Sequence, residues 1–217
     1  MRPIFVTGTG TEVGKTVVSA ILVEALHADY WKPIQAGDLE ETDTDRVRRL
    51  VSNELTSYHP EAVRLRTPAS PHAAAKAEGR RIDLDELALP SVARARPLVV
   101  EGAGGLLVPL NEREVMVDLI EKLDAETVVV SKNYLGSINH TLLTLEALAH
   151  RRVPMLGLVF NGEENVESES VILAKTGVPL LGRLRWEATL TPAIIRHHAE
   201  QFASVLARHG RSRVVGT

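Results

Sequence analysis

The sequence predicts an α/β fold in which a mostly parallel central sheet carries helices on both faces. Short aliphatic or β-branched runs alternate with longer helical patterns along the 217 residues, which is typical of repeated strand–helix–strand units. A glycine-rich loop ending in Gly14-Lys15-Thr16 separates the first strand from the first helix. Because no repeat, linker or low-complexity tract divides the chain, we expect one domain over residues 1–217.

The elements are expected in a regular order along the chain. In the first part we predict strands at 4–6 and 30–34 and helices at 15–28 and 45–51. Prolines weaken the pattern between 58 and 97, where only a helix near 72–78 is expected. The pattern then returns with strands at 98–100, 127–130, 155–160 and 180–183 and helices at 138–150, 167–175 and 192–208. Thr191, which precedes Pro192, suits the N-cap of the last helix.

The composition excludes several classes of protein. The formal net charge of −3 provides no general basic field for nucleic acid or an anionic membrane, and the arginines at 208, 211 and 213 fit a frayed C-terminal tail. Cysteine is absent, which excludes disulfides, thiolate metal sites and cysteine nucleophiles. No apolar run is long enough to span a membrane, and the N-terminus carries no signal-peptide pattern. We therefore expect a cytoplasmic enzyme that uses neither nucleic acid nor a membrane as a partner.

The loop at residues 8–16, Gly-Thr-Gly-Thr-Glu-Val-Gly-Lys-Thr, predicts a phosphate-binding P-loop. Free N–H groups and the helix dipole attract anions to a helix N-terminus, and glycines let the backbone approach them closely. Lys15 can then reach the β- and γ-phosphates, while the Thr16 hydroxyl can complete a Mg²⁺ shell. The alternative, a glycine-rich turn with a solvated lysine, is disfavoured by the order of strand, loop and helix. The first glycine stands at position 8, one residue earlier than in the standard motif, which indicates a distinct branch of P-loop proteins.

Further polar residues are expected at the carboxyl ends of neighbouring strands, where open α/β sheets hold their ligands. Lys32 lies in an apolar strand and is costly to bury without an anionic partner, although it could also reach water at the strand end. The acidic run at 40–45 is usually a solvated face, but one carboxylate could bind Mg²⁺, and we prefer Asp45 to Asp43 because it opens the predicted helix. Glu101 ends a hydrophobic strand, the usual position of a second metal-side acid, with a solvated glutamate as the alternative.

Together these segments resemble the dethiobiotin synthetase family. The resemblance runs from residue 4 to about 162, and its motifs occur in the family's order. They are the extended P-loop at 8–16, Lys-Pro-Ile-Gln-Ala-Gly at 32–37, Ser-Pro-His at 70–72, Glu-Gly-Ala-Gly-Gly at 101–105 and Leu-Gly-Ser-Ile-Asn-His at 135–140. Several motifs in the same order are far more specific than any one of them.

The resemblance implies a Mg²⁺-dependent ligase of biotin biosynthesis with a P-loop fold. Its reaction converts 7,8-diaminononanoate, CO₂ and ATP to dethiobiotin, ADP and phosphate through a carbamate and a carbamic-phosphoric anhydride. An alkylamine has a pKa of about 10.4, so nearby positive charge favours the neutral, nucleophilic amine. Negative charge accumulates at each step, and fixed cations stabilise it.

The resemblance also implies a role for each candidate site residue. Lys15 and Lys32 would clamp the carbamate and the γ-phosphate, with Thr11 as the third catalytic residue, and the metal ligands would be Thr16, Asp45 and Glu101. The nucleotide-binding residues would be Glu12, Val13, Gly14, Lys15, Thr16, Val17 and, for adenine, Asn161. The substrate-binding residues would be Thr11, Lys32, Ala36, Gly104, Gly136, Ser137 and Asn139. The last three start a helix that suits the substrate carboxylate and reaches across a homodimer, so that the partner subunit completes each site.

Some positions depart from the family's pattern. Ala36 replaces a common hydroxyl residue, so one substrate hydrogen bond is expected to be missing or supplied by Gln35. Asn133-Tyr134 replaces small or basic residues before the Leu-Gly motif, and Arg185-Trp186 stands where a Pro-Trp pair is common in the adenine-side loop.

Rival functions exist on the same fold. A P-loop partitioning or assembly ATPase usually carries a second lysine inside the P-loop, where this chain has Thr11, Glu12 and Val13. An amide-forming ligase needs a glutamine-hydrolysing domain, for which this chain has neither the length nor a cysteine. A nucleotide-binding module without chemistry would not need Lys32 or Glu101.

Overall fold

A parallel sheet forms the centre of the computed structural model, which describes residues 1–90, 96–185, 187 and 189–208. Seven strands pair in the order β4-β2-β6-β1-β7-β8-β9, and all of their pairings are parallel. They are β1 (Ile4–Gly8), β2 (Asp29–Trp31), β4 (Tyr58–His59), β6 (Leu98–Glu101), β7 (Glu126–Lys132), β8 (Met155–Asn161) and β9 (Leu180–Leu184). Two further strands, β3 (Ile34–Ala36) and β5 (Val63–Leu65), form a separate small sheet.

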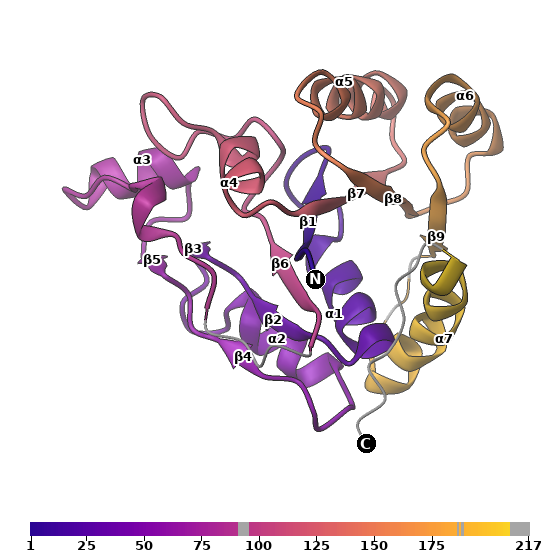
Figure 1. The fold of residues 1–217 in the computed structure, drawn as a ribbon, viewed down its shortest axis with the longest axis horizontal. Coiled ribbons are helices and arrows are strands. Elements are labelled where there is room, and N and C mark those ends of the chain that lie inside the picture. Colours follow the sequence, from indigo (N-terminus) through magenta and orange to yellow (C-terminus); the bar gives the residue numbers. More distant parts are fainter. Residues whose placement is uncertain (91–95, 186, 188, 209–217) are drawn as a thin grey trace.

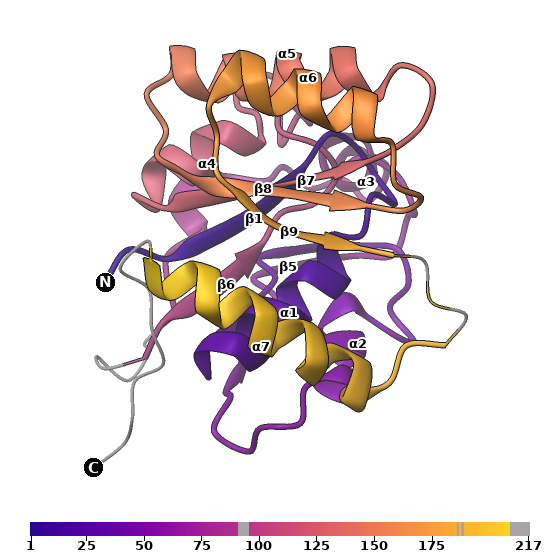
Figure 2. The same ribbon diagram turned by 90° about the vertical axis from the view of Figure 1, so that its right-hand side faces the viewer.

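Helices cover both faces of the sheet (Figures 1 and 2). One face carries α1 (Lys15–Leu26), α2 (Asp43–Leu50) and α7 (Pro192–Arg208), and the other α4 (Met116–Lys122), α5 (Ser137–His150) and α6 (Val166–Thr176), with α3 (Pro71–Ala77) beside the small sheet. A short 3₁₀ turn, η1, covers Leu84–Glu86. The predicted α/β fold with a mostly parallel sheet is therefore confirmed.

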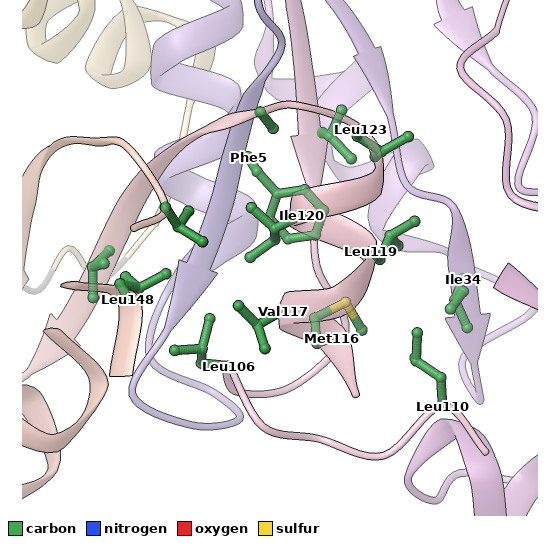
Figure 3. Packing of buried hydrophobic residues seen from close by; sticks show 14 of the residues in the cluster. Phe5, Ile34, Leu106, Leu110, Met116, Val117, Leu119, Ile120, Leu123 and Leu148 are labelled. Atoms are coloured by element: carbon green, nitrogen blue, oxygen red, sulfur yellow. The ribbon is translucent and has the colours of Figure 1, made fainter. Parts of the chain in front are cut away.

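The alternation of side chains along β1 divides the core into two clusters. Ile4 and Val6 pack with α1 and α7, whereas Phe5 points to the opposite face, because successive strand residues alternate. Figure 3 shows Phe5 beside Ile120 of α4, with other α4 side chains extending along the sheet. Ile4, Phe5 and Val6 are all completely buried, so β1 packs against helices on both of its faces.

Most predicted elements are confirmed to within a few residues, and the differences have local causes. The strand expected at 30–34 is two strands, because Pro33 lacks an N–H and restricts the preceding residue, which interrupts the ladder after Trp31. The helix expected from 45 begins at Asp43 instead, since Thr42 caps it. Helix α4 is absent from the predictions, as are the short β4, β5 and η1.

The strand order determines where the functional residues lie. Because β6 pairs with both β1 and β2, the carboxyl ends of these three strands meet at one edge of the sheet. The P-loop, Glu101 and Lys32 follow or end those strands. Within the described residues, no helix is long and apolar enough to cross a membrane. Trp186, Arg211 and Arg213 lie outside the described residues.

Candidate active site

The P-loop connects β1 to α1, and its shape explains the early glycine. A Cβ at Gly8 would lie 2.5 Å from the Cγ2 atom of Val13, so the loop can fold back on itself only without that side chain. Gly14 caps α1 with a φ of 102°, and a Cβ there would lie 2.3 Å from Nδ2 of Asn161. The glycine displaced from the standard position thus serves the packing of the loop itself.

The N-terminus of α1 provides an anion-binding surface. No side chain among the described residues caps its first turn, so backbone N–H groups and the positive end of the helix dipole face outward. Lys15 is the first residue of the helix and donates from Nζ to the carbonyl oxygen of Gly10 at 2.8 Å. Burial lowers the pKa of Lys15 to about 8; Glu101 opposes this shift, Lys32 adds to it and Asp43 opposes it. The hydrogen bond to Gly10 therefore holds Nζ of Lys15 inside the loop, where phosphates would bind.

Lys32 lies between two carboxylates at the end of β2. Its Nζ is 2.6 Å from Oδ2 of Asp43 and 3.1 Å from Oε1 of Glu101. Thr16 contacts the same carboxylates, donating from Oγ1 to Asp43 at 3.1 Å or to Glu101 at 2.9 Å. Burial alone would lower the pKa of the Lys32 ammonium, but Glu101 and Asp43 outweigh it and raise that pKa. Lys32 is thus a buried cation, not a solvated lysine at the strand end.

Tyr30 was not predicted as part of this cluster. Its hydroxyl donates to Oε2 of Glu101 at 2.8 Å, and both residues are almost completely buried. Burial and the neighbouring charge of Glu101 raise the pKa of Tyr30 well above its usual value, so the phenol stays protonated. Residues two apart in a strand share a face, so Tyr30 and Lys32 both contact Glu101. The spacing of these two residues in the sequence could therefore have predicted that Tyr30 belongs to the cluster.

Asp43, and not Asp45, lies in the cluster. Asp45 is the third residue of α2, where its Oδ2 accepts from the backbone N and the hydroxyl of Thr42 in a capping box. Its Oδ1 pairs with Arg48 at 3.2 Å, on the outer side of the helix. Asp43 is the first residue of α2 and faces Thr16 and Lys32, which lower the pKa of its carboxyl against the effect of burial. The structure therefore places Asp43, and not the predicted Asp45, beside Thr16 and Lys32.

The oxygen atoms around Thr16 fit a magnesium ion chemically. The Thr16 hydroxyl lies within hydrogen-bond distance of one oxygen from Asp43 and one from Glu101, and Mg²⁺ prefers hard oxygen ligands of this kind. Two carboxylates and a hydroxyl leave further positions for water and phosphate oxygens, as is usual for Mg²⁺ at nucleotide sites. Among the described residues, no group of three or more His, Cys, Asp or Glu side chains is arranged to hold a metal.

Gln35, the expected substitute for the hydrogen bond that Ala36 lacks, uses its side-chain amide within the protein. The Gln35 side chain is buried, donates from Nε2 to the carbonyl oxygen of Gly37 at 2.9 Å, and accepts through Oε1 from the backbone N of Asp43 at 3.4 Å. Its amide connects β3 to the start of α2. Gln35 therefore helps to position Asp43.

Two cavities adjoin the first turns of α5. A groove of about 410 Å³ lies between the P-loop and α5, and apolar residues dominate its lining; it is bounded by Thr9, Gly10, Thr11, Gly105, Leu106, Leu107, Val108, Pro109, His140, Leu143, Thr144 and Ala147. A larger cavity of about 730 Å³ contains Gly136, Ile138 and Asn139 at the start of α5. Gly136 caps this helix with a φ of 102°, and Ser137 is buried behind it. Thr11 therefore lies beside the groove, whereas Gly136 and Asn139 line a separate cavity.

The expected adenine-side residues lie at the ends of β8 and β9. Asn161 donates from Nδ2 to the carbonyl oxygen of Val13 at 2.8 Å, which joins the strand end to the P-loop. Arg185 is exposed and pairs with Glu164 at 3.8 Å. Its neighbour Trp186 is outside the described residues.

Asn133 and Tyr134, which depart from the family's pattern before the Leu-Gly motif, each contact another side chain. The Tyr134 hydroxyl lies 2.6 Å from Nδ1 of His140, so it spans the first turn of α5. Asn133 donates from Nδ2 to Glu169 of α6 at 2.6 Å. These contacts therefore stabilise the loop that leads into α5.

Similarity to known proteins extends over most of the chain. A family model described as an AAA domain matches residues 2–193. The ATP-dependent dethiobiotin synthetase BioD of Christiangramia forsetii is 49% identical over 201 residues, covering 93% of this chain and 96% of the relative. The enzyme of the same name from Rhodopseudomonas palustris strain HaA2 is 53% identical over 183 residues, covering 84% and 85%.

Solved structures with the same fold are more distant in sequence. The cell division ATPase MinD of Pyrococcus furiosus has a TM-score of 0.60 at 14% identity, covering 96% of this chain and 100% of that one. A ParA family ATPase from Chlorobium tepidum has a TM-score of 0.53 at 13% identity, covering 97% and 93%. At these identities the likeness extends to the fold alone.

Proposed function

The chain belongs to the family of ATP-dependent dethiobiotin synthetases, ligases of biotin biosynthesis, and we propose that it closes the cyclic urea of dethiobiotin through a carbamate and a carbamic-phosphoric anhydride. The observation that carries this proposal is a second buried cation beside the P-loop. Lys32 contacts Glu101 and Asp43 from the end of β2, while Lys15, at the start of α1, is close enough for the charges of both carboxylates to act on it. A nucleotide needs one such lysine, whereas a carbamate that attacks the γ-phosphate brings additional negative charge that a second lysine stabilises.

The reaction would proceed in three steps with balanced charges. One neutral amine of 7,8-diaminononanoate attacks CO₂ and loses a proton, which gives a carbamate anion. A carbamate oxygen then attacks the γ-phosphorus of ATP and expels ADP, which forms the mixed anhydride. Finally the second amine attacks the carbonyl carbon, loses a proton and expels inorganic phosphate, which closes the ring. Negative charge develops on the departing ADP oxygen in the second step and on the departing phosphate oxygen in the third, so fixed positive charge has its largest effect there.

The residues of the cluster take different parts in this chemistry. The N–H groups of residues 12–17 would hold the phosphates, and Lys15 and Lys32 would contact the γ-phosphate and the carbamate, which Thr11 orients. Thr16, Asp43 and Glu101 would hold Mg²⁺, which when bound neutralises phosphate charge. Tyr30 would hold Glu101 in place through its hydrogen bond to Oε2.

The hydrocarbon part of the substrate needs an apolar surface next to Thr11. The groove of about 410 Å³ supports this role, because it begins at the P-loop and its lining is mostly aliphatic. The substrate carboxylate would then meet the N-terminus of α5 at Gly136, Ser137 and Asn139 of the partner subunit. We propose Asn161 for adenine recognition, and Gly104 and Ala36 as further substrate neighbours.

A homodimer is part of the proposal. Leu107, Leu135 and Leu143 are large apolar side chains that are more than half exposed, and all of them line the two cavities at α5. Apolar residues gathered on one surface commonly mark an interface. Because ATP and the diamine are intracellular metabolites, we also propose that the enzyme works in the cytoplasm, without nucleic acid or a membrane as a partner.

Substrate omission tests the proposed reaction directly. ATP consumption should require both diaminononanoate and bicarbonate, and it should fall to background when either is left out. Turnover that is indifferent to the diamine would contradict the assignment.

A lysine variant tests the proposed role of the second cation. Lys32→Gln should retain most of its affinity for ADP, because the P-loop is unchanged, while ATP consumption is lost. Lys175→Gln, at the exposed end of α6, is the matched control and should behave as wild type. Equal losses of affinity and turnover in Lys32→Gln would make Lys32 a nucleotide anchor only.

A further inference from the structure

Lys32 contacts the same two carboxylates as the Thr16 hydroxyl, and at Glu101 it contacts the same oxygen atom. Oε1 of Glu101 lies 3.1 Å from Nζ of Lys32 and 2.9 Å from Oγ1 of Thr16. Asp43 contacts both residues through different oxygens, with Oδ2 at Lys32 and Oδ1 at Thr16. We propose that Lys32 and a divalent cation compete for Glu101 and Asp43, so that uptake of the cation releases the Lys32 ammonium toward the reacting anion. The direction of that release rests on the proposed function, whereas the competition rests on the contacts alone.

Glu101 cannot serve both cations with separate oxygens. Its Oε2 already accepts the hydrogen bond of the Tyr30 hydroxyl at 2.8 Å, and the carboxylate is 1% exposed. Only Oε1 is directed toward Thr16 and Lys32. A magnesium ion takes its oxygen ligands at about 2.0–2.1 Å, so an ammonium cannot keep its hydrogen bond to the same atom without strong repulsion between the cations. The competition is therefore centred on Oε1 of Glu101.

The charges of the cluster lead to the same conclusion. Asp43 and Glu101 carry two negative charges, and Lys32 neutralises one of them at close range. A divalent cation would neutralise both, so the Lys32 ammonium would lose its nearest attraction. Its side chain is only 5% exposed, and a buried cation without a partner is costly. The released ammonium therefore gains affinity for an incoming anion, which couples metal uptake to binding of the carbamate.

The first experiment measures binding of Mn²⁺ to the full chain without nucleotide. Removing the competing charge in Lys32→Gln should tighten Mn²⁺ binding at least about tenfold in calorimetry, because a like charge a few ångströms away is lost. Lys175→Gln should bind Mn²⁺ as wild type does. Tyr30→Phe, which frees Oε2 of Glu101, should also bind Mn²⁺ more tightly than wild type, an effect that a merely structural role for Lys32 does not predict. Equal affinities of wild type and Lys32→Gln would overturn the proposal.

The second experiment uses thermal stability, because Lys32→Gln leaves two buried carboxylates without their cation. Saturating Mg²⁺ should raise the Tm of Lys32→Gln by on the order of 5 °C and that of wild type by much less. If Lys32→Gln stays unfolded with Mg²⁺ while a Lys32→Met/Glu101→Gln double variant folds, the ion cannot replace the ammonium and the proposal fails. Failure of the proposed function is distinguishable, since it would show as diamine-independent ATP turnover with the Mn²⁺ affinities still different.

Discussion

Exchange of Asp43 for asparagine, compared with the same exchange at Asp45, tests the site most directly. Both residues lie in the first turn of α2, two positions apart. Asparagine at 43 can still accept a hydrogen bond from Thr16 or Lys32, at the present distances of 3.1 and 2.6 Å, but it removes the charge. Removal of one hydrogen-bond donor that stabilises a transition state typically costs about 10²–10³-fold in kcat, or about 2.7–4 kcal/mol, and loss of a carboxylate that would hold the metal should have an effect of similar size. We expect a loss of this size for Asp43→Asn.

Asp45→Asn should have the opposite profile. The side chain closes a capping box with Thr42, and helix caps contribute about 0.5–2 kcal/mol to stability. We therefore expect a lower Tm with kcat within about twofold of wild type, measured as diamine-dependent ADP release at saturating Mg²⁺. The reasoning is refuted if Asp45→Asn loses turnover while Asp43→Asn keeps it, because Asp45 would then be the metal-side acid after all.

Three other features of the chain lead to testable predictions. Hydrogen bonds from Ser52 and Asn53 outweigh the opposing effect of burial and keep the pKa of Glu24 below its usual value. Glu24→Gln should therefore lower the free energy of unfolding by about 1–2 kcal/mol at neutral pH, and urea titrations should find this difference present above pH 4.5 and shrinking as the pH falls below it. Gly14→Ala, whose Cβ would meet Asn161, should weaken calorimetric ADP binding at least about tenfold, while Gly79→Ala, with open space around it, should not. Leu143→Glu should convert the expected dimer to monomers in light scattering and abolish turnover; an intact dimer would refute the assigned interface.

The sequence predicted the parts of the site that depend on local order. The P-loop, Lys32 and Glu101 each follow a strand whose hydrophobic pattern is clear, and β2, β6 and β1 turn out to be neighbours. The order of the strands in the sheet brings these residues together. For this reason the sequence alone could predict that Lys32 and Glu101 lie at the same edge of the sheet, although they are far apart along the chain.

The parts that the sequence did not predict depend on which side of an element a residue faces. Two acidic residues in a first turn are indistinguishable by composition, and only the N-cap at Thr42 decides that Asp45 closes the cap while Asp43 faces the site. Helix α4 was missed because it is short and its N-cap residue is Val115, which provides no polar N-cap signal. Its start is stabilised instead by Asp118, whose carboxylate accepts from the backbone N of Val115 at 2.7 Å.

The position of the second lysine in the chain distinguishes this protein from the partitioning ATPases that share its fold. MinD and ParA-family proteins have the same architecture, so the arrangement of strands does not decide between a ligase and a partitioning ATPase. Here the second lysine comes from the end of β2, while position 11 of the P-loop is a threonine that lines an apolar groove. Because Lys32 follows β2, which β6 separates from β1, the second lysine does not occupy a position within the P-loop itself. Dependence of ATP turnover on the diamine is therefore the property that distinguishes the two functions.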